Sequence, residues 1–217
     1  MYIPHANRED DPAILLAFMR EHAFITLVSI LDGIPFASHV PVALRDDAGQ
    51  FTIIGHLAKA NPQWRTFGTG EALAIFNGPH AYISPSLYEK HESVPTWNYI
   101  AVHAYGVPQP VFFNDAHAAL EGSLRELIAT YEAAYQTHWE SLPVKFREGM
   151  LQGVVGFEIA VTRLEGKYKL SQNRSHTDQH TVAHALLASG DPAAQATGAA
   201  MQTQLAARDS QASRLSS

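Results

Sequence analysis

Three consecutive β-rich segments joined by tight turns constrain the fold of this chain most strongly. Phe24–Ile30 is rich in β-branched residues and is followed by Asp32–Gly33, a dipeptide that favours two-residue hairpin turns. Pro35–Leu44 is the partner strand, and a second turn at Asp46–Gly49 leads to a third strand at Phe51–Leu57. Because antiparallel hairpins in series form a meander, the sequence predicts a barrel or a sandwich.

Helical segments and further strands are expected around this meander. Apolar residues recur at helical spacing over Asp10–His22 and Asp115–Tyr135, and Asn61 followed by Pro62 is a typical helix start. The further expected strands are Ala72–Asn77, Ala81–Ser84, Asn98–Tyr105 and Val154–Leu164, with an interruption around Gly78–Pro79. The sequence therefore predicts an α+β chain that is mainly β.

The composition changes near the end of the sequence. Residues 190–217 are rich in Ala, Gln and Ser and contain few large apolar side chains. We expect this tail to be partly helical or disordered, and frayed beyond about Asp191. Residues 1–189 hold all of the expected strands and include a helix from His176, so they are interpreted as one domain.

Composition excludes several classes of function. The chain of 217 residues has no cysteine, which excludes disulfides, thiolate zinc sites and cysteine nucleophiles. Its formal net charge of −6 argues against a broad DNA-binding face. No segment is apolar for long enough to cross a bilayer, and Met1–His5 lacks the regions of a signal peptide. We therefore expect a cytoplasmic protein with no membrane partner.

The segment Gly55–Trp64 is the most informative candidate site. It leads from a strand through a loop into a helix, where unpaired backbone N–H groups and the charge of Lys59 could receive a phosphate. A plain capped helix with a solvated lysine is an equally good interpretation of the same residues. The segment matches neither a P-loop nor a dinucleotide-binding fingerprint.

Two further segments carry polar and aromatic side chains. Val94–Tyr99 places a tryptophan, an amide and a tyrosine at the start of a strand, where they could contact a heterocycle. Lys167–Ser175 is a dense run of hydrogen-bond donors. Core packing is the alternative interpretation of the first segment, and a solvated loop that of the second.

The histidines define no catalytic or metal site by spacing. His176, His180 and His184 share one face of the expected C-terminal helix, but no carboxylate at an obvious spacing completes a metal site. We therefore expect no metal. His39 and His56 could approach one another in the expected barrel, yet no spacing assigns an acid–base role, and the catalytic residues are unknown.

Several of these strings resemble those of the PaiB family of FMN-binding negative transcriptional regulators. The similar strings are MYIP at 1–4, GHLAKANPQW at 55–64, GPHAYISP at 78–85, VPTWNY at 94–99, VHAYG at 102–106 and KLSQNR at 169–174. The resemblance runs from Met1 to about Leu187, with Ser38–Pro41 reading SHVP where THLP is more usual.

The resemblance implies a six-stranded antiparallel split barrel, related to pyridoxamine-phosphate oxidases, with peripheral helices and a C-terminal helix. Such barrels form homodimers that hold FMN near the interface. The flavin-binding residues it implies in the first half of the chain are His39, His56, Leu57, Ala58, Lys59, Asn61 and Trp64. Those it implies along the ring or ribityl chain, from either subunit, are Thr96, Trp97, Asn98, Gln172 and Asn173.

Two functions follow from this resemblance. The first is a homodimeric regulator that senses redox state or flavin. The second is an FMN-dependent oxidoreductase of the flavin reductase or oxidase type, for which Arg65, Lys90 and Arg174 could receive an anionic electron donor. Haem binding is a third, weaker alternative. The family name implies DNA as a partner, but the chain has no helix-turn-helix signature and no basic arm.

Overall fold

The computed structural model describes residues 1–215, which form nine strands, six α-helices and three short 3-10 helices. The chain divides into two compact units. We call Asp11–Phe76 with Val102–Leu164 the central unit. Met1–Asp10, Asn77–Ala101 and the chain from Glu165 on form the terminal unit. No helix within the described residues has the length and apolar character needed to cross a membrane.

The nine strands form one antiparallel sheet, and both units contribute residues to it. The central strands are β2 (Phe24–Leu31), β3 (Ile34–Asp47), β4 (Gln50–Ala58), β7 (Gln109–Val111) and β8 (Val154–Ala160). β1 (Arg8–Glu9) lies in the terminal unit, while β5 (Ala72–Ile83), β6 (Thr96–Gly106) and β9 (Arg163–Lys169) run from one unit into the other. The hydrogen-bonded order is β1-β9-β6-β5-β2-β3-β4-β8-β7.

The mainly antiparallel architecture agrees with the sequence, but the strand count does not. Residues 1–215 contain nine strands where six were expected, and the sheet has free edges at β1 and β7, so it is not closed. Two strand boundaries also differ. β5 continues through Gly78–Pro79, and the expected strand Val154–Leu164 is divided between β8 and β9.

The meander of the central unit is built as the sequence indicates. Asp32 and Gly33 both have positive φ angles, of 53° and 78°, which the tight β2–β3 hairpin requires. The long strand β3 pairs with β2 over Ile34–Pro41 and with β4 over Val42–Asp47. One strand therefore connects two parts of the sheet.

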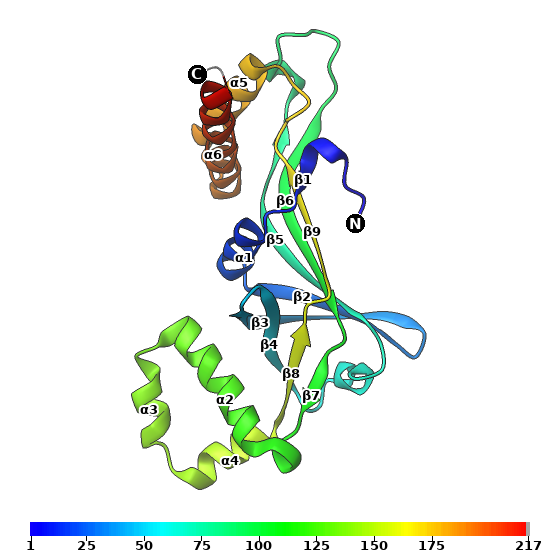
Figure 1. Ribbon diagram of the computed structural model, residues 1–217, viewed down its shortest axis with the longest axis vertical. Coiled ribbons are helices and arrows are strands. Elements are labelled where there is room, and N and C mark those ends of the chain that lie inside the picture. Colours follow the sequence, from blue (N-terminus) through cyan, green and yellow to red (C-terminus); the bar gives the residue numbers. More distant parts are fainter. Residues whose placement is uncertain (216–217) are drawn as a thin grey trace. The chain divides into compact units, whose positions relative to one another are not determined.

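Helices cover the central unit (Figure 1). α1 (Pro12–Glu21) is capped by Asp11, whose side chain accepts from the Ala13 N–H at 2.8 Å. The expected helix over Asp115–Tyr135 is observed as α2 (Phe113–Glu132), with a non-helical backbone at Ala116. α3 (Tyr135–Ser141) and α4 (Val144–Gln152) follow it.

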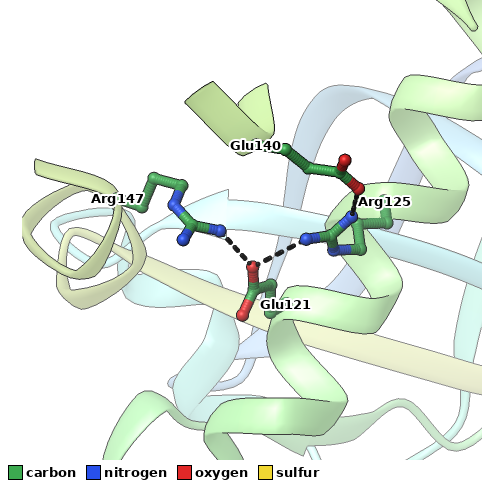
Figure 2. Close-up of polar contacts among 4 residues, drawn as sticks. All are labelled: Glu121, Arg125, Glu140 and Arg147. Atoms are coloured by element: carbon green, nitrogen blue, oxygen red, sulfur yellow. Dashed lines mark hydrogen bonds and ion pairs between the residues drawn. The ribbon is translucent and has the colours of Figure 1, made fainter. Parts of the chain in front are cut away.

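An ion-pair network joins α2, α3 and α4 (Figure 2). Glu121 of α2 accepts from Arg147 of α4 at 2.9 Å and from Arg125 at 3.3 Å. Arg125 also donates to Glu140 of α3 at 2.6 Å. Because Glu121 and Arg147 are about four-fifths buried, this pair fixes α4 against α2 more firmly than an exposed pair would.

The C-terminal region of the terminal unit is a pair of helices. α5 (His176–Leu187) and α6 (Pro192–Leu215) pack side by side (Figure 1). Met201 and Leu205 of α6 are buried, so the region expected to fray beyond Asp191 is a packed helix. Ser216 and Ser217 of the tail lie outside the described residues.

Candidate functional site

The loop that follows β4 is fixed by main-chain hydrogen bonds. The Lys59 N–H donates to the Gly153 carbonyl at 2.9 Å, extending the pairing of β4 with β8. The Asn61 N–H donates back to Ala58 at 2.8 Å. Trp64 closes the loop, since its Nε1 donates to the Lys59 carbonyl at 2.9 Å.

Asn61 caps the helix that follows, as its position before Pro62 indicates. Its side chain accepts from the Gln63 N–H at 3.0 Å and donates through Nδ2 to Ser38 Oγ at 2.7 Å. The helix, η2 (Pro62–Thr66), is a 3-10 helix of five residues, and Pro62 has no N–H. The dipole of so short a helix contributes little, so the anion-binding capacity of the loop rests on the charge of Lys59.

Lys59 is exposed, and no carboxylate of the described residues forms an ion pair with it. It lines a cavity of about 310 Å³ together with the start of α2, Gln152 and Val154. Trp64 forms an edge-to-face contact with Phe112 beside this cavity, with ring centroids 5.6 Å apart. A lysine ammonium held over an open cavity is suited to an anionic group.

His56 lies on β4 opposite Gly156 of β8. A Cβ at Gly156 would lie 2.6 Å from the Cδ1 methyl group of Leu120, so this side chain of α2 packs directly against the sheet beside His56. Burial lowers the pKa of the His56 imidazole, which therefore favours the neutral form. Its Nδ1 is buried and has no hydrogen-bond partner within the described part of the chain. Neighbouring Leu57 is buried and points to the other face of the strand.

His39 lies on a different surface from Asn61. Alternation along β3 directs Ser38 towards η2 and His39 to the opposite face. There His39 Nδ1 lies 3.1 Å from Thr26 Oγ1, and its ring stacks against Phe24 at 6.4 Å. The structure therefore separates His39 from the capping side of the loop.

The outer face of the β2–β3 hairpin is apolar and exposed. Phe24 and Ile30 of β2 are 67% and 58% exposed, and Pro35 of β3, which pairs with Ile30, is also exposed. Val28 of β2 and Ala37 of β3 face each other between them. Antiparallel strands with one solvated face normally place polar residues there, so this face is unusual for a solvent-exposed sheet.

In the terminal unit, Lys169 organises the start of β6. Its Nζ donates to Thr96 Oγ1 and, at 2.7 Å, to the Trp97 carbonyl. Burial lowers the pKa of Lys169. Asn98 is fully buried, and its Nδ2 donates to Ser171 Oγ at 2.9 Å. The Asn98 side chain therefore holds β6 to the turn after β9.

Trp97 belongs to an exposed aromatic cluster. Its ring lies 6.1 Å from His80 and 6.0 Å from Tyr82, both of β5. The three rings line a cavity of about 390 Å³ that also includes Leu186 of α5 and Ala194 of α6. Such walls suit a planar ligand.

Gln172 and Asn173 differ in their environments. The Gln172 amide accepts from the Leu170 N–H at 2.7 Å and donates to the Tyr168 carbonyl and to Gln204 of α6. It therefore braces the turn before α5. Asn173 is exposed.

The sequence-predicted residues thus fall into two groups. His56, Leu57, Ala58, Lys59, Asn61 and Trp64 lie together on one segment of the central unit, with His39 on another face of it. Thr96, Trp97, Asn98, Gln172 and Asn173 lie in the terminal unit. Sequence reasoning did not select Lys169, His80 or Tyr82 for the site, although all three lie within strings that carry the family resemblance.

Residues 1–163 match the family described as "Putative FMN-binding domain". The chain is 38% identical over 212 residues to "Protease synthase and sporulation protein PAI 2" of Bacillus subtilis, covering 94% of this chain and 98% of the relative.

Solved structures with a similar fold include two flavoproteins. The flavocytochrome Anf3 from Azotobacter vinelandii has a TM-score of 0.60 at 14% identity, covering 76% of this chain and 70% of its own. The FAD and haem binding protein from Mycobacterium smegmatis has a TM-score of 0.60 at 13% identity, covering 75% and 73%. The expected flavin-binding split-barrel fold is therefore confirmed, in a variant with nine strands and an open sheet.

The residues of the central unit fit the phosphate end of FMN. A phosphate dianion requires a cation and hydrogen-bond donors, and Lys59 supplies an ammonium that forms no ion pair within the described residues, although Asp115 lines the same cavity. The buried, unpartnered Nδ1 of His56 is a further polar atom three residues away in the chain.

Proposed function

Since this chain belongs to the family of FMN-binding domains and FMN is its cofactor, we propose that it is a homodimeric regulator of the PaiB type that responds to redox state or to flavin. Bound FMN would supply a two-electron redox centre. The protein's own contribution is to hold the cofactor and to pass its state to a partner. The observation that carries the proposal is the Lys59 loop over an open cavity.

The phosphate-binding part of the proposal rests on the loop after β4. Lys59 binds the phosphate, Asn61 holds the loop against β3, and Trp64 fixes the Lys59 carbonyl. His56, Leu57 and Ala58 make up the strand that leads into it. That Thr96, Trp97, Gln172 and Asn173 line the ring or the ribityl chain stays a prediction. We assign Asn98 a structural role because the Nδ2 and Oδ1 atoms of its side chain both form hydrogen bonds with Ser171, within the terminal unit.

The homodimer is supported by the outer face of the β2–β3 hairpin. Phe24 and Ile30 would be removed from water if a second copy covered this face. His39 lies among them and would enter the interface. A twofold interface between identical hairpins buries the same apolar surface on each partner.

Direct DNA binding is not part of the proposal. The chain carries 15 Lys and Arg residues against 21 Asp and Glu residues. A face that neutralises several phosphates needs clustered basic side chains. We therefore expect a protein or a small molecule to carry the signal.

An FMN-dependent oxidoreductase is the second candidate function. The specific observation in its favour is the aromatic cavity of His80, Tyr82 and Trp97, which could receive a planar organic substrate or electron donor. A reductase or oxidase would turn over NAD(P)H or an organic substrate, whereas a sensor would change redox state without sustained turnover.

The first experiment is the absorption spectrum of freshly purified protein, with the mass of the released chromophore. A flavin spectrum with the mass of FMN supports the proposal, and a haem spectrum or a colourless protein that takes up no FMN contradicts it. Light scattering tests the dimer. Steady NAD(P)H oxidation would favour the oxidoreductase. A salt-sensitive shift in the electrophoretic mobility of DNA on addition of the protein would show that it binds DNA directly.

A further inference from the structure

α5 and α6 bring together two histidines and an aspartate that are far apart in the sequence. His176 and His180 stand one turn apart on α5, with ring centroids 4.4 Å apart. His176 Nε2 lies 3.1 Å from Asp209 Oδ1 of α6 and 3.3 Å from His180 Nε2. One ligand atom of each residue lies within 4.8 Å of the other two. The carboxylate that no sequence spacing indicated is supplied by a different helix.

No single tautomer of His176 can both donate to Asp209 and accept from His180 through Nε2. An imidazole Nε2 carries either a hydrogen or a lone pair. If His176 Nε2 accepts from His180, it has no hydrogen for Asp209. If it donates to Asp209, it has no lone pair for His180. All three side chains reach solvent, so water can complete their hydrogen bonds, whereas a cation can receive a lone pair from each of the three atoms at once.

Two of the three separations between ligand atoms agree with metal coordination, and the third lies within 4.8 Å. Zn–N bonds of 2.0–2.1 Å in a tetrahedral arrangement place two ligand atoms about 3.3 Å apart. The His176–His180 and His176–Asp209 separations, 3.3 and 3.1 Å, are close to this value. The carboxylate contributes a negative charge, and the nearby cation Arg208 is directed to Gln179 at 3.5 Å.

The packing of the helix pair supports this geometry. Gly198 of α6 faces α5 so closely that a Cβ there would lie 3.0 Å from the Ala183 carbonyl and from Leu186. Val182 of α5 and Thr197 of α6 are fully buried. Because the helices are tightly packed, the separation of the ligands is set by the scaffold. The pair also lies beyond residues 1–163, which match the FMN-binding family.

We propose that His176, His180 and Asp209 form a binding site for one divalent transition-metal ion of the zinc type. Two imidazoles and one carboxylate, without thiolates, suit Zn²⁺, Co²⁺ or Ni²⁺ better than Ca²⁺ or Mg²⁺, which prefer oxygen ligands. Three protein ligands leave one position open to water or to a further ligand. The bound ion connects the end of α6 to the start of α5.

The test is calorimetric titration of the tag-free full chain with Zn²⁺. The parent protein should bind one ion, and H176A, H180A and D209N should each weaken binding at least about tenfold, the loss that even an indirect partner of a metal ligand can cause. H184A is the matched control, because His184 is exposed on the same helix but is not among the three clustered ligands. It should leave the affinity unchanged.

Two further measurements keep the outcome decisive. Zn²⁺ should raise the melting temperature of the parent and of H184A in proportion to the logarithm of its concentration, and should not do so for H176A. Far-UV circular dichroism verifies that each variant is folded. No saturable binding by the parent, or equal loss in H184A and H176A, would overturn the proposal. Neither outcome bears on FMN, which is measured separately by absorption.

Discussion

Replacing Lys59 by methionine should separate cofactor binding from folding. The side chain is exposed, while the contacts that shape the loop are made by the Lys59 main chain, to Gly153 and to Trp64. These main-chain bonds survive the substitution. A charge-assisted hydrogen bond to a phosphate is worth about 1.5–3 kcal/mol. We therefore expect the Kd for FMN to rise about 10- to 100-fold with the free energy of unfolding unchanged.

The assay is a titration of the apoprotein with FMN, followed by the quenching of flavin fluorescence, alongside urea unfolding. K145M is the matched control, since Lys145 is an exposed lysine of α4 in the same unit. N61A gives the contrasting result, because it removes the cap of η2 and the bond to Ser38. N61A should lower the free energy of unfolding by about 1 kcal/mol as well as weaken FMN binding. A folded K59M protein with parental FMN affinity would refute the phosphate assignment.

Three other perturbations have definite expected outcomes. E121Q should lower the free energy of unfolding in urea by about 1–3 kcal/mol, whereas E140Q, at a more exposed pair, should cost about 0.5 kcal/mol. F24D should convert a dimer to a monomer in light scattering, and an unchanged mass would exclude this face as the interface. Burial lowers the pKa of His56 below 6.5, so on acidification the imidazole is protonated in the unfolded chain before it is protonated in the folded one. The contribution of His56 to the free energy of unfolding is therefore fully present well above pH 6.5 and is lost as the pH falls through this value. The slope of the free energy of unfolding of the apoprotein against pH, to which this group contributes at most about 1.4 kcal/mol per pH unit, should decrease in H56Q.

The parts of the fold that local chemistry specifies are the parts that the sequence predicts. The β2–β3 hairpin follows from its Asp-Gly turn, and the cap of η2 from Asn61. The division between β8 and β9 was missed because both halves alternate in the same way. The break depends on partners distant in the sequence, since the Val161 N–H donates to Phe51 and the Thr162 N–H to Tyr105.

The packing of the C-terminal region cannot be predicted from its composition for a related reason. Few large apolar residues suggested fraying, but small residues allow two helices to approach closely, and Gly198 lies directly against α5. The histidine ladder on α5 is visible in the sequence. Its carboxylate partner, Asp209, is 33 residues from His176, and only the packing of α6 reveals it.

The β2–β3 hairpin couples the two halves of the proposed function. Its inner face anchors the cofactor loop, through Ser38 to Asn61 and through the Leu27 carbonyl to the buried amide of Gln63. Its outer face carries Phe24 and the other exposed apolar residues. Covering that face in a dimer would restrict the hairpin and so favour the loop conformation that binds phosphate. Coupling of this kind is reciprocal, so FMN must then tighten the dimer by the same factor by which dimerisation tightens FMN. Equal dimer dissociation constants with and without FMN would show that the two faces act independently.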